Sequence, residues 1–502
     1  MNDQEAVHFH STPPIVAERM ASLLRSALED GQPRVRLLDP GVGEGALSVA
    51  AAGALAESGC EVAVTGIDVS SELLGAAEAN LSAARVQASL HKSDFLRESN
   101  LNGFDAAICN PPYGKRSQAE LGEGILLEYK EAISGHPNLF ALFIHKIIRA
   151  LRPGGVCVII CPKSLMSGPY FHALRRFLLE QGSIENLLLF DQRFGLFEGV
   201  LQGVFVFQFR KGALQGECTV HRVISSEGED RWVIDTPYAE GDEFAQRIIP
   251  GSSASNRELL LKALHYPVSI ADRFPVETGP LVWFRHRDRL LRTSAAEDAI
   301  PIIWSDQIEQ GYISPGRRPD RLRSAGMNRF ALTQSKLGPA LVTKRVTAPE
   351  EERRLVAGLT ASPLWSRPVI YENHTNVIRS KGGDIDELVR LELLFGTDLY
   401  DDLLRALSHN TQVGAADLRI LPFVQLPLEE GEREAVLKAA EEGMALPELL
   451  DLGKVGDRLL EVLSASNFGD PDIAANGNVV HLTLPFGEPA SGSIDGRKPV
   501  DA

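Results

Sequence analysis

Short apolar runs alternate with longer amphipathic stretches between residue 34 and about residue 210. Short runs rich in Val, Ile and Leu are typical of buried strands, whereas apolar residues that recur every three or four positions are typical of helices. Strands that alternate with helices form a mostly parallel sheet covered on both faces. The pattern therefore predicts an α/β fold built on a doubly wound sheet. Strands are expected at 35–39, 62–68, 86–91, 105–109, 156–161, 184–190 and 204–209, and helices at 44–58, 71–84, 140–151 and 170–180.

The second half of the chain has a different pattern. Beyond about residue 215 the alternation fades, and short strand-like pieces mix with charged, proline-bearing loops. A chain of 502 residues is also too long for one compact core. We therefore expect one domain over residues 1–215 and a second, mixed α+β domain over residues 216–466. Residues 467–502 are rich in Gly, Asp, Pro and Ser and are expected to form a flexible tail.

The composition narrows the class of protein. No apolar run approaches the roughly 18–20 residues of a membrane helix, and the N-terminus lacks the layout of a signal peptide. The five cysteines are scattered, which favours reduced thiols over a disulfide framework or a metal site. We therefore expect a cytoplasmic protein without a bound metal. The formal net charge of −16 argues against a chain that coats nucleic acid with its whole surface, but screening leaves room for a local basic region.

Three of the expected strands end on residues suited to binding a ligand, and ligands of doubly wound sheets bind beyond the carboxyl ends of the strands. Glycines in such a turn let the backbone approach a ligand, and carboxylates can accept from ribose hydroxyls or an adenine amino group. The spacing differs from the Gly-x-Gly-x-x-Gly of dinucleotide folds, and a leading acid favours a cationic ligand such as S-adenosylmethionine. A purely structural turn is the alternative for the glycines. The segments concerned are Asp39-Pro40-Gly41-Val42-Gly43-Glu44-Gly45, Asp68 and Asp94-Phe95.

A rigid polar turn, Asn110-Pro111-Pro112-Tyr113, follows the fourth expected strand. Two prolines cannot continue a sheet ladder, so they hold the chain extended. The Asn110 side-chain carbonyl and the Pro111 backbone carbonyl would then be two fixed acceptors. A planar amino group bonded to both is pulled toward tetrahedral nitrogen, and its lone pair can attack a methyl group on sulfur. Tyr113 would stack on the base that carries the amino group. A proline-rich turn without catalytic function is the alternative.

The order of these parts resembles the N6-adenine DNA methyltransferases of restriction–modification systems, in the gamma-group arrangement with an Asn-Pro-Pro-Tyr motif. An early Thr-Pro-Pro element of that group is matched by Ser11-Thr12-Pro13-Pro14. The resemblance implies a Rossmann-like methyltransferase sheet, S-adenosylmethionine as cofactor and a C-terminal target-recognition domain. It implies cofactor contacts from Thr12, Asp39, Gly41, Gly43, Asp68, Asp94, Phe95, Asn138 and Phe140. The residues Val42-Gly43-Glu44 depart from the family pattern, but the glycines are kept.

A base in a duplex must be flipped out before it can be methylated, and two stacked rings could offset most of the cost. One ring would be Tyr113. The family places another aromatic just before the last strand, which indicates Phe197, with Phe194 as an alternative. Core packing is the other interpretation of either phenylalanine.

The second domain carries a local excess of basic residues. Residues 276–354 contain 14 Lys and Arg against 10 Asp and Glu, a balance of +4 in an acidic chain. Basic side chains on phosphates give affinity, whereas contacts to bases give sequence preference; a solvated charged face is the alternative. The expected DNA contacts are Arg285, Arg287, Arg317, Arg318, Lys344 and Arg345. Four phrases also resemble recognition domains of related methylases: 278–283, 343–348, 372–374 and 410–413.

The motifs predict a sequence-specific DNA methyltransferase acting on N6 of adenine. Double-stranded DNA would be its partner, a separately encoded endonuclease a second one, and a monomer its form. Asn-Pro-Pro-Tyr also occurs in enzymes that methylate a glutamine amide or an RNA guanine, but the large basic second domain favours DNA. N4 of cytosine stays open, although enzymes of that group more often have Ser before the prolines. A non-catalytic specificity subunit would predict damage at Asn110 or in the glycine turn, and both are intact.

Overall fold

The computed structural model describes most of the chain. The described residues are 12–29, 31–114, 116–133, 137–190, 203–224, 228–239, 247–291, 299–314, 324–326, 329–347, 351–408 and 412–465. Phe194, Phe197, Arg317, Arg318 and the expected tail lie outside them. Within the described ranges, no helix is both long enough and apolar enough to span a bilayer.

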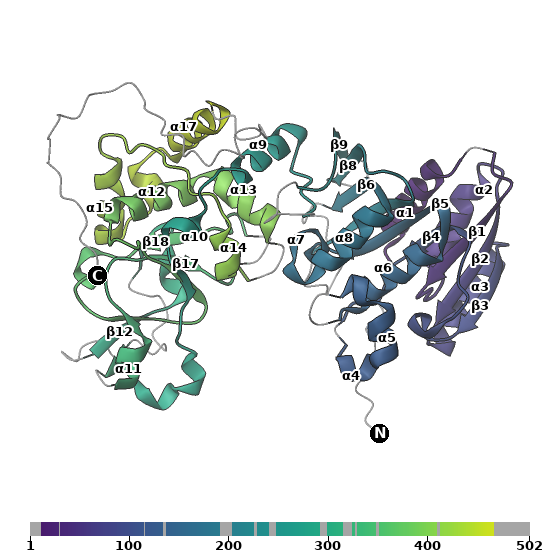
Figure 1. Cartoon of the computed structure of the whole chain (residues 1–502), viewed down its shortest axis with the longest axis horizontal. Helices are drawn as coiled ribbons and strands as arrows, with labels where there is room; N and C mark the ends of the chain where they lie inside the picture. Colours follow the sequence, from purple (N-terminus) through teal and green to yellow (C-terminus); the bar gives the residue numbers. More distant parts are fainter. Residues whose placement is uncertain are drawn as a thin grey trace, which may run out of the picture.

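The first half forms one long sheet with helices on both faces (Figure 1). Its strands are β1 (Arg34–Pro40), β2 (Glu61–Asp68), β3 (Gln87–Lys92), β4 (Phe104–Cys109), β5 (Leu151–Pro162), β6 (Gly182–Phe190), β7 (Val204–Lys211), β8 (Cys218–Val223) and β9 (Glu229–Ile234). Its helices are α1 (Pro14–Ala27), α2 (Ala46–Ala56), α3 (Ser71–Ala83), α4 (Gln118–Leu121), α5 (Glu123–Glu128), α6 (Leu139–Ala150), α7 (Ser164–Ser167) and α8 (His172–Gln181).

The strand order of this sheet is β3-β2-β1-β4-β5-β7-β6-β8-β9. β1 pairs in parallel with both β2 and β4, so the chain order reverses between β1 and β4. β7 runs antiparallel between β5 and β6. The doubly wound α/β sheet predicted from the sequence is confirmed, and its switch point lies where the glycine turn and Asn110 follow their strands.

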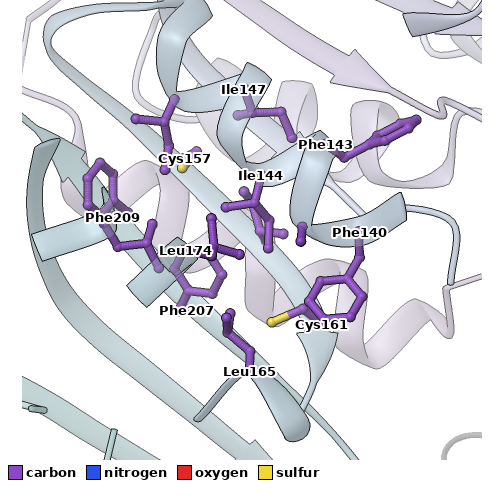
Figure 2. Close-up of a cluster of buried hydrophobic side chains, with 14 of the residues drawn as sticks. Phe140, Phe143, Ile144, Ile147, Cys157, Cys161, Leu165, Leu174, Phe207 and Phe209 are labelled. Atoms are coloured by element: carbon purple, nitrogen blue, oxygen red, sulfur yellow. The ribbon is translucent and has the colours of Figure 1, made fainter. Parts of the chain in front are cut away.

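The helix α6 shows how the apolar pattern builds the core. Ten of its twelve residues are buried, because other elements of the domain pack around the helix. Figure 2 shows Phe140, Ile144 and Ile147 of α6 close to Cys157 on β5 and Phe207 on β7. This packing fixes the start of α6 beside the carboxyl end of β4.

The sheet extends past residue 215, where the sequence pattern placed the end of the first domain. β8 pairs in parallel with β6, and β9 pairs antiparallel with β8. β8 has three buried residues and β9 only Ile234, so these outer strands lack the continuous apolar run of the central strands. The first sheet therefore ends at Ile234.

The second half has mixed structure with two small sheets (Figure 1). One sheet has the order β10-β20-β17-β18-β14-β13 and the other β11-β15-β12-β19-β16. The strands are β10 (Val276–Thr278), β11 (Leu290–Leu291), β12 (Ala299–Ile303), β13 (Ile308–Glu309), β14 (Gly311–Ile313), β15 (Ser324–Gly326), β16 (Ser335–Lys336), β17 (Leu341–Lys344), β18 (Ala357–Leu359), β19 (Val369–Tyr371) and β20 (Thr375–Ile378). The helices are α9 (Ala254–Leu264), α10 (Ile270–Arg273), α11 (Arg329–Gln334), α12 (Ile385–Gly396), α13 (Asp398–Leu407), α14 (Ala415–Arg419), α15 (Glu432–Glu442), α16 (Leu446–Leu449) and α17 (Leu452–Ala465).

Candidate active site

The turn after β1 depends on glycine. Gly41, Gly43 and Gly45 have φ angles of +74°, +54° and +83°, which side chains with a Cβ rarely adopt. The Gly41 N–H donates to the Ile67 carbonyl at 2.7 Å, so the turn folds back over the end of β2. A Cβ on Gly41 would come within 3.9 Å of the Asn110 carbonyl oxygen. The turn therefore brings the backbone close to the residues that follow β4.

Asp39 lies below this turn as a buried, half-satisfied carboxylate. Its side chain accepts from the Ser48 hydroxyl through Oδ2 at 2.6 Å. Its Oδ1 is buried and has no hydrogen-bond partner in the described part of the chain. Burial raises the pKa of Asp39 to about 7. An ammonium group would satisfy Oδ1 and keep the carboxylate ionised, so this site fits the amino acid end of S-adenosylmethionine.

Asp68 organises the same turn. Its Oδ2 accepts from the Gly43 N–H at 3.1 Å, and its Oδ1 accepts from the Ser70 N–H at 2.9 Å. A carboxylate has about four acceptor sites, so both oxygens can still take a ribose hydroxyl. The structure thus gives Asp68 a structural role that the sequence did not predict, beside the expected cofactor contact.

Asp94 and Phe95 follow β3. The Asp94 carboxylate caps the short helix Phe95–Arg97 by accepting from the Leu96 N–H at 3.0 Å. Phe95 is buried, and its ring centroid lies 4.9 Å from that of Phe143 on α6. The Lys146 Nζ lies 5.4 Å from the centroid of the Phe95 ring. It donates to the carbonyls of Leu96 at 3.0 Å and Glu98 at 2.6 Å. Lys146 therefore anchors the segment that carries Phe95.

Asn110 is held at both ends of its amide. Its Nδ2 donates to the Thr12 hydroxyl at 3.1 Å, and its Oδ1 accepts from the Tyr113 hydroxyl at 3.1 Å. The Cys109 thiol donates to the Pro40 carbonyl at 3.0 Å, which ties the ends of β4 and β1 together. Because Thr12 accepts from the amide nitrogen, the amide oxygen is turned to the opposite side. Sequence reasoning placed Thr12 only against the cofactor.

Tyr113 joins Asn110 to the start of α6. Burial raises the pKa of Tyr113 well above its usual range, so the phenol stays a donor. Its ring meets the buried ring of Phe140 edge-on, with centroids 6.4 Å apart. The Asn138 side chain caps α6 by accepting from the Phe140 N–H at 3.4 Å. Asn138 and Phe140 thus lie beside the Asn-Pro-Pro-Tyr turn, with Phe140 as part of the core.

The sequence missed two side chains of this region, Ser48 and Lys146. Ser48 gave no signal, because its contact with Asp39 depends on how α2 follows the turn. Lys146 could have been found, since it is the one Lys or Arg in the stretch 139–148, which is apolar apart from Lys146 and its neighbour His145. A buried lysine in such a position requires acceptors, and here backbone carbonyls supply them.

The expected DNA contacts are not gathered at this site. Arg285 and Arg287 are exposed on the short helices Trp283–Arg285 and Arg287–Arg289 of the second domain. Lys344 ends β17, and Arg345 follows it with its Nη1 donating to the Asn373 carbonyl at 2.8 Å. The structure therefore describes four of the six, all in the second domain.

Comparison with known proteins agrees with this geometry. Residues 65–197 match the family model of the Eco57I restriction-modification methylase. The type II methyltransferase M.PstI of Providencia stuartii is 26% identical over 443 residues, which cover 81% of this chain and 85% of that protein. M.BsuBI of Bacillus subtilis is 27% identical over 355 residues, which cover 67% and 68%. Each match covers more than half of the chain, so the similarity to both extends into its two halves.

Among solved structures, the type IIL restriction-modification enzyme MmeI, determined in complex with DNA, shares the fold with a TM-score of 0.52. The match covers 92% of this chain and 73% of that chain at 13% identity. The Rossmann-like methyltransferase fold and the cofactor predicted from the sequence are confirmed. By these similarities the chain resembles the restriction–modification DNA methyltransferases, and S-adenosylmethionine is the cofactor that the family model and the fold support.

Proposed function

We propose that the chain methylates N6 of adenine at a specific site in double-stranded DNA, as the modification enzyme of a restriction–modification system. The observation that supports this most is the fixed orientation of Asn110. Its amide nitrogen donates to Thr12, its side-chain oxygen accepts from Tyr113, and its backbone carbonyl lies close to Gly41 in the β1 turn. A planar amino group is the substrate that such an acceptor recognises.

The side chains divide the work between holding and positioning. When bound, S-adenosylmethionine supplies a methyl group on a positively charged sulfur. Asp39 would hold its ammonium, and Asp68 and Asp94 would accept from the ribose and the adenine of the cofactor. Asn110 and the Pro111 carbonyl would accept the two hydrogens of the target amino group, which makes the nitrogen lone pair available for attack. One amino proton leaves to water, so the chain needs no general base.

The target base would compete with a contact that exists in the free protein. The Tyr113 hydroxyl occupies the Asn110 oxygen, and an incoming amino group would replace it. Tyr113 could then stack on the base, and stacking contributes roughly 1–3 kcal/mol toward the cost of flipping. Phe197 stays our choice for the second ring, with Phe194 as the alternative.

The second domain would supply site recognition. Arg285, Arg287, Lys344 and Arg345 are our proposed contacts to DNA among the described residues, and Arg317 and Arg318 are proposed from the sequence. One chain then carries both catalysis and recognition, which favours a monomer. A separately encoded endonuclease would cut the same site, and both would act in the cytoplasm.

The test is expression of the chain in a host that lacks adenine methylation, followed by sequencing that detects modified bases. N6-methyladenine at one recurring motif is expected, and Asn110→Ala should abolish it. Asn102→Ala, an exposed asparagine in the loop before β4, is the matched control and should leave the pattern unchanged. N4-methylcytosine would correct the base and keep the mechanism. Unmodified DNA from a folded protein that binds S-adenosylmethionine would overturn the proposal.

A further inference from the structure

Four segments that are far apart in the sequence meet at one place in the second domain. They are residues 279–281, 344–347, 372–374 and 412–413, and each belongs to one of the four phrases noted in the sequence. The turn 372–374 leads from β19 in the five-stranded sheet to β20 in the six-stranded sheet. We call the four segments together the sheet junction.

Backbone hydrogen bonds hold the sheet junction together. The Asn373 N–H donates to the Leu281 carbonyl at 2.9 Å, and the Arg345 N–H donates to the His374 carbonyl at 2.9 Å. The Val413 N–H in turn donates to the Arg345 carbonyl at 2.7 Å. A Cβ on Gly279 would lie 2.1 Å from the Glu372 carbonyl oxygen, so only glycine allows this approach. The convergence is therefore built into the fold.

At its centre, a buried carboxylate holds a half-exposed histidine. Glu372 is 1% exposed, and its Oε1 lies 2.6 Å from His374 Nδ1. Its Oε2 accepts from the His374 N–H at 3.0 Å. The His374 side chain is 45% exposed. Oε1 accepts from a protonated Nδ1, so the ring is held in one orientation and Nε2 is the nitrogen left for a ligand, to which it donates when the ring carries both protons.

Other polar groups at the sheet junction are unsatisfied. Asn373 Oδ1, Arg345 Nε and Thr347 Oγ1 are buried, and none has a hydrogen-bond partner in the ranges that the structure describes. A buried polar group that lacks a hydrogen bond costs about 1–3 kcal/mol of folding free energy. Native structures leave few of them, so three in one place indicate a site that a ligand completes.

The charge and neighbours of the sheet junction favour an anionic ligand. Lys344 and Arg345 bring positive charges, whereas the only carboxylate among the described residues of the junction, Glu372, is buried under the histidine. Phe284 lies three residues after Leu281 and is 61% exposed. The Arg285 guanidinium lies 5.8 Å from the centroid of its ring. Cations beside an exposed aromatic ring are typical of surfaces that bind nucleic acid.

We propose that the sheet junction is a DNA-contact site at which His374, presented by Glu372, donates through Nε2 to an acceptor on the DNA. Lys344 and Arg345 flank it and add positive charge. The acceptor is a phosphate oxygen or the N7/O6 edge of a guanine, which offer the same chemistry. This inference rests on the proposed function, because it requires DNA as the substrate.

The test measures the dissociation constants of full-length variants for two unmethylated duplexes, one that contains the sequence that the enzyme methylates and one that lacks it. Both are measured in the presence of S-adenosylhomocysteine. His374→Ala should weaken binding about 10- to 100-fold. Glu372→Gln, which keeps the shape but removes the charge, should cause a smaller loss. The matched control is His265→Ala, an exposed histidine of the same domain whose ring contacts its own helix. It should bind within twofold of the wild type.

The outcomes separate the two acceptors and the two proposals. An equal loss of affinity on both duplexes identifies a phosphate contact. The slope of log K against log[salt] should then be about 1 smaller than that of the wild type. A loss confined to the site duplex, with a relaxed methylation motif, identifies a base. If the wild type methylates DNA and the folded His374→Ala and Glu372→Gln variants both bind as it does, this inference alone is overturned. A wild type that methylates no DNA overturns the proposed function as well.

Discussion

Two buried carboxylates, Asp39 and Glu372, serve two polar regions in opposite ways. At the cofactor end of the long sheet, Asp39 has one oxygen without a partner among the described residues, so it presents negative charge to a ligand. At the sheet junction, His374 engages both oxygens of Glu372, so the carboxylate is turned inward and the neighbouring Lys344 and Arg345 supply positive charge instead. The first arrangement suits a ligand with an ammonium group, and the second suits an anion such as DNA. Which charge faces outward is decided by what the chain itself places beside the carboxylate.

The largest effect is expected from a substitution of Asp39. Asp39→Ala removes the partner of the cofactor ammonium, and we expect the affinity for S-adenosylmethionine to fall about 100-fold. Isothermal titration calorimetry measures this affinity. Glu44→Gln removes a negative charge from the exposed part of the same turn and is the control, expected within twofold of the wild type. Equal losses in both variants would mean that general charge, and not Asp39, binds the cofactor.

Binding of the cofactor should release a proton from Asp39. Burial raises the pKa of Asp39 to about 7 in the free protein, and a bound ammonium would lower it. Below pH 7, binding should therefore release a proton, and affinity should rise with pH until about 7 and then level off. Calorimetry in buffers of different ionisation enthalpy counts the proton. The same release in Asp39→Asn would assign it to another group.

Tyr113 tests whether the site is organised for a base. Tyr113→Ala removes the stacking ring, and we expect the methylation rate to fall about 5- to 30-fold, which corresponds to roughly 1–2 kcal/mol. Tyr113→Phe keeps the ring and removes only the hydroxyl's hydrogen bond to the Asn110 oxygen, so its rate should stay within about threefold of the wild type. Single-turnover methylation of a site duplex gives both rates. A Phe variant as slow as the Ala variant would show that the hydroxyl, and not the ring, matters.

Thr12 should affect the reaction more than cofactor binding. Thr12→Val keeps the shape but removes the acceptor that orients the Asn110 amide. One hydrogen bond is worth about 0.5–1.5 kcal/mol, so we expect kcat to fall about 2- to 10-fold with the dissociation constant of S-adenosylmethionine unchanged. Thr12→Ser should restore the rate. A loss of cofactor affinity at constant kcat would instead return Thr12 to the role that the sequence suggested.

A third buried carboxylate, outside both of these regions, sharpens the comparison. Glu392 on α12 is fully buried, and this burial raises its pKa to about 8 against the lowering effects of Arg353 and the Gly311 backbone. Its folded pKa lies above its unfolded value, so it stabilises the fold below about pH 4.5 and loses that effect as the pH rises through 8. The Tm of the wild type should therefore fall about 2–8 °C relative to Glu392→Gln between pH 5 and 9. Parallel Tm curves would contradict this, and thermal unfolding monitored by circular dichroism measures it.

The long sheet could be predicted from the sequence because each of its signals is local. Strand runs and the residues that end them are adjacent in the chain, so Asp39, Asp68 and Asn110 could be assigned to one edge. The bond between Asn110 and Thr12 spans 98 residues and has no local signal. The same holds for the sheet junction. The strands of the two sheets that meet there have two to five residues, which is too short to show an alternation of apolar and polar positions. Its four phrases could be noticed, but their meeting could not be foreseen.

The sheet junction sets a limit on how specificity can be exchanged between relatives. Its segments are distributed over residues 279–413, and each one supports the others through backbone hydrogen bonds. Grafting a single loop from another methylase would insert a residue beside Gly279 or Arg345 that its neighbours do not match. A functional chimera should therefore need all four segments from the same donor, transplanted as one discontinuous cassette.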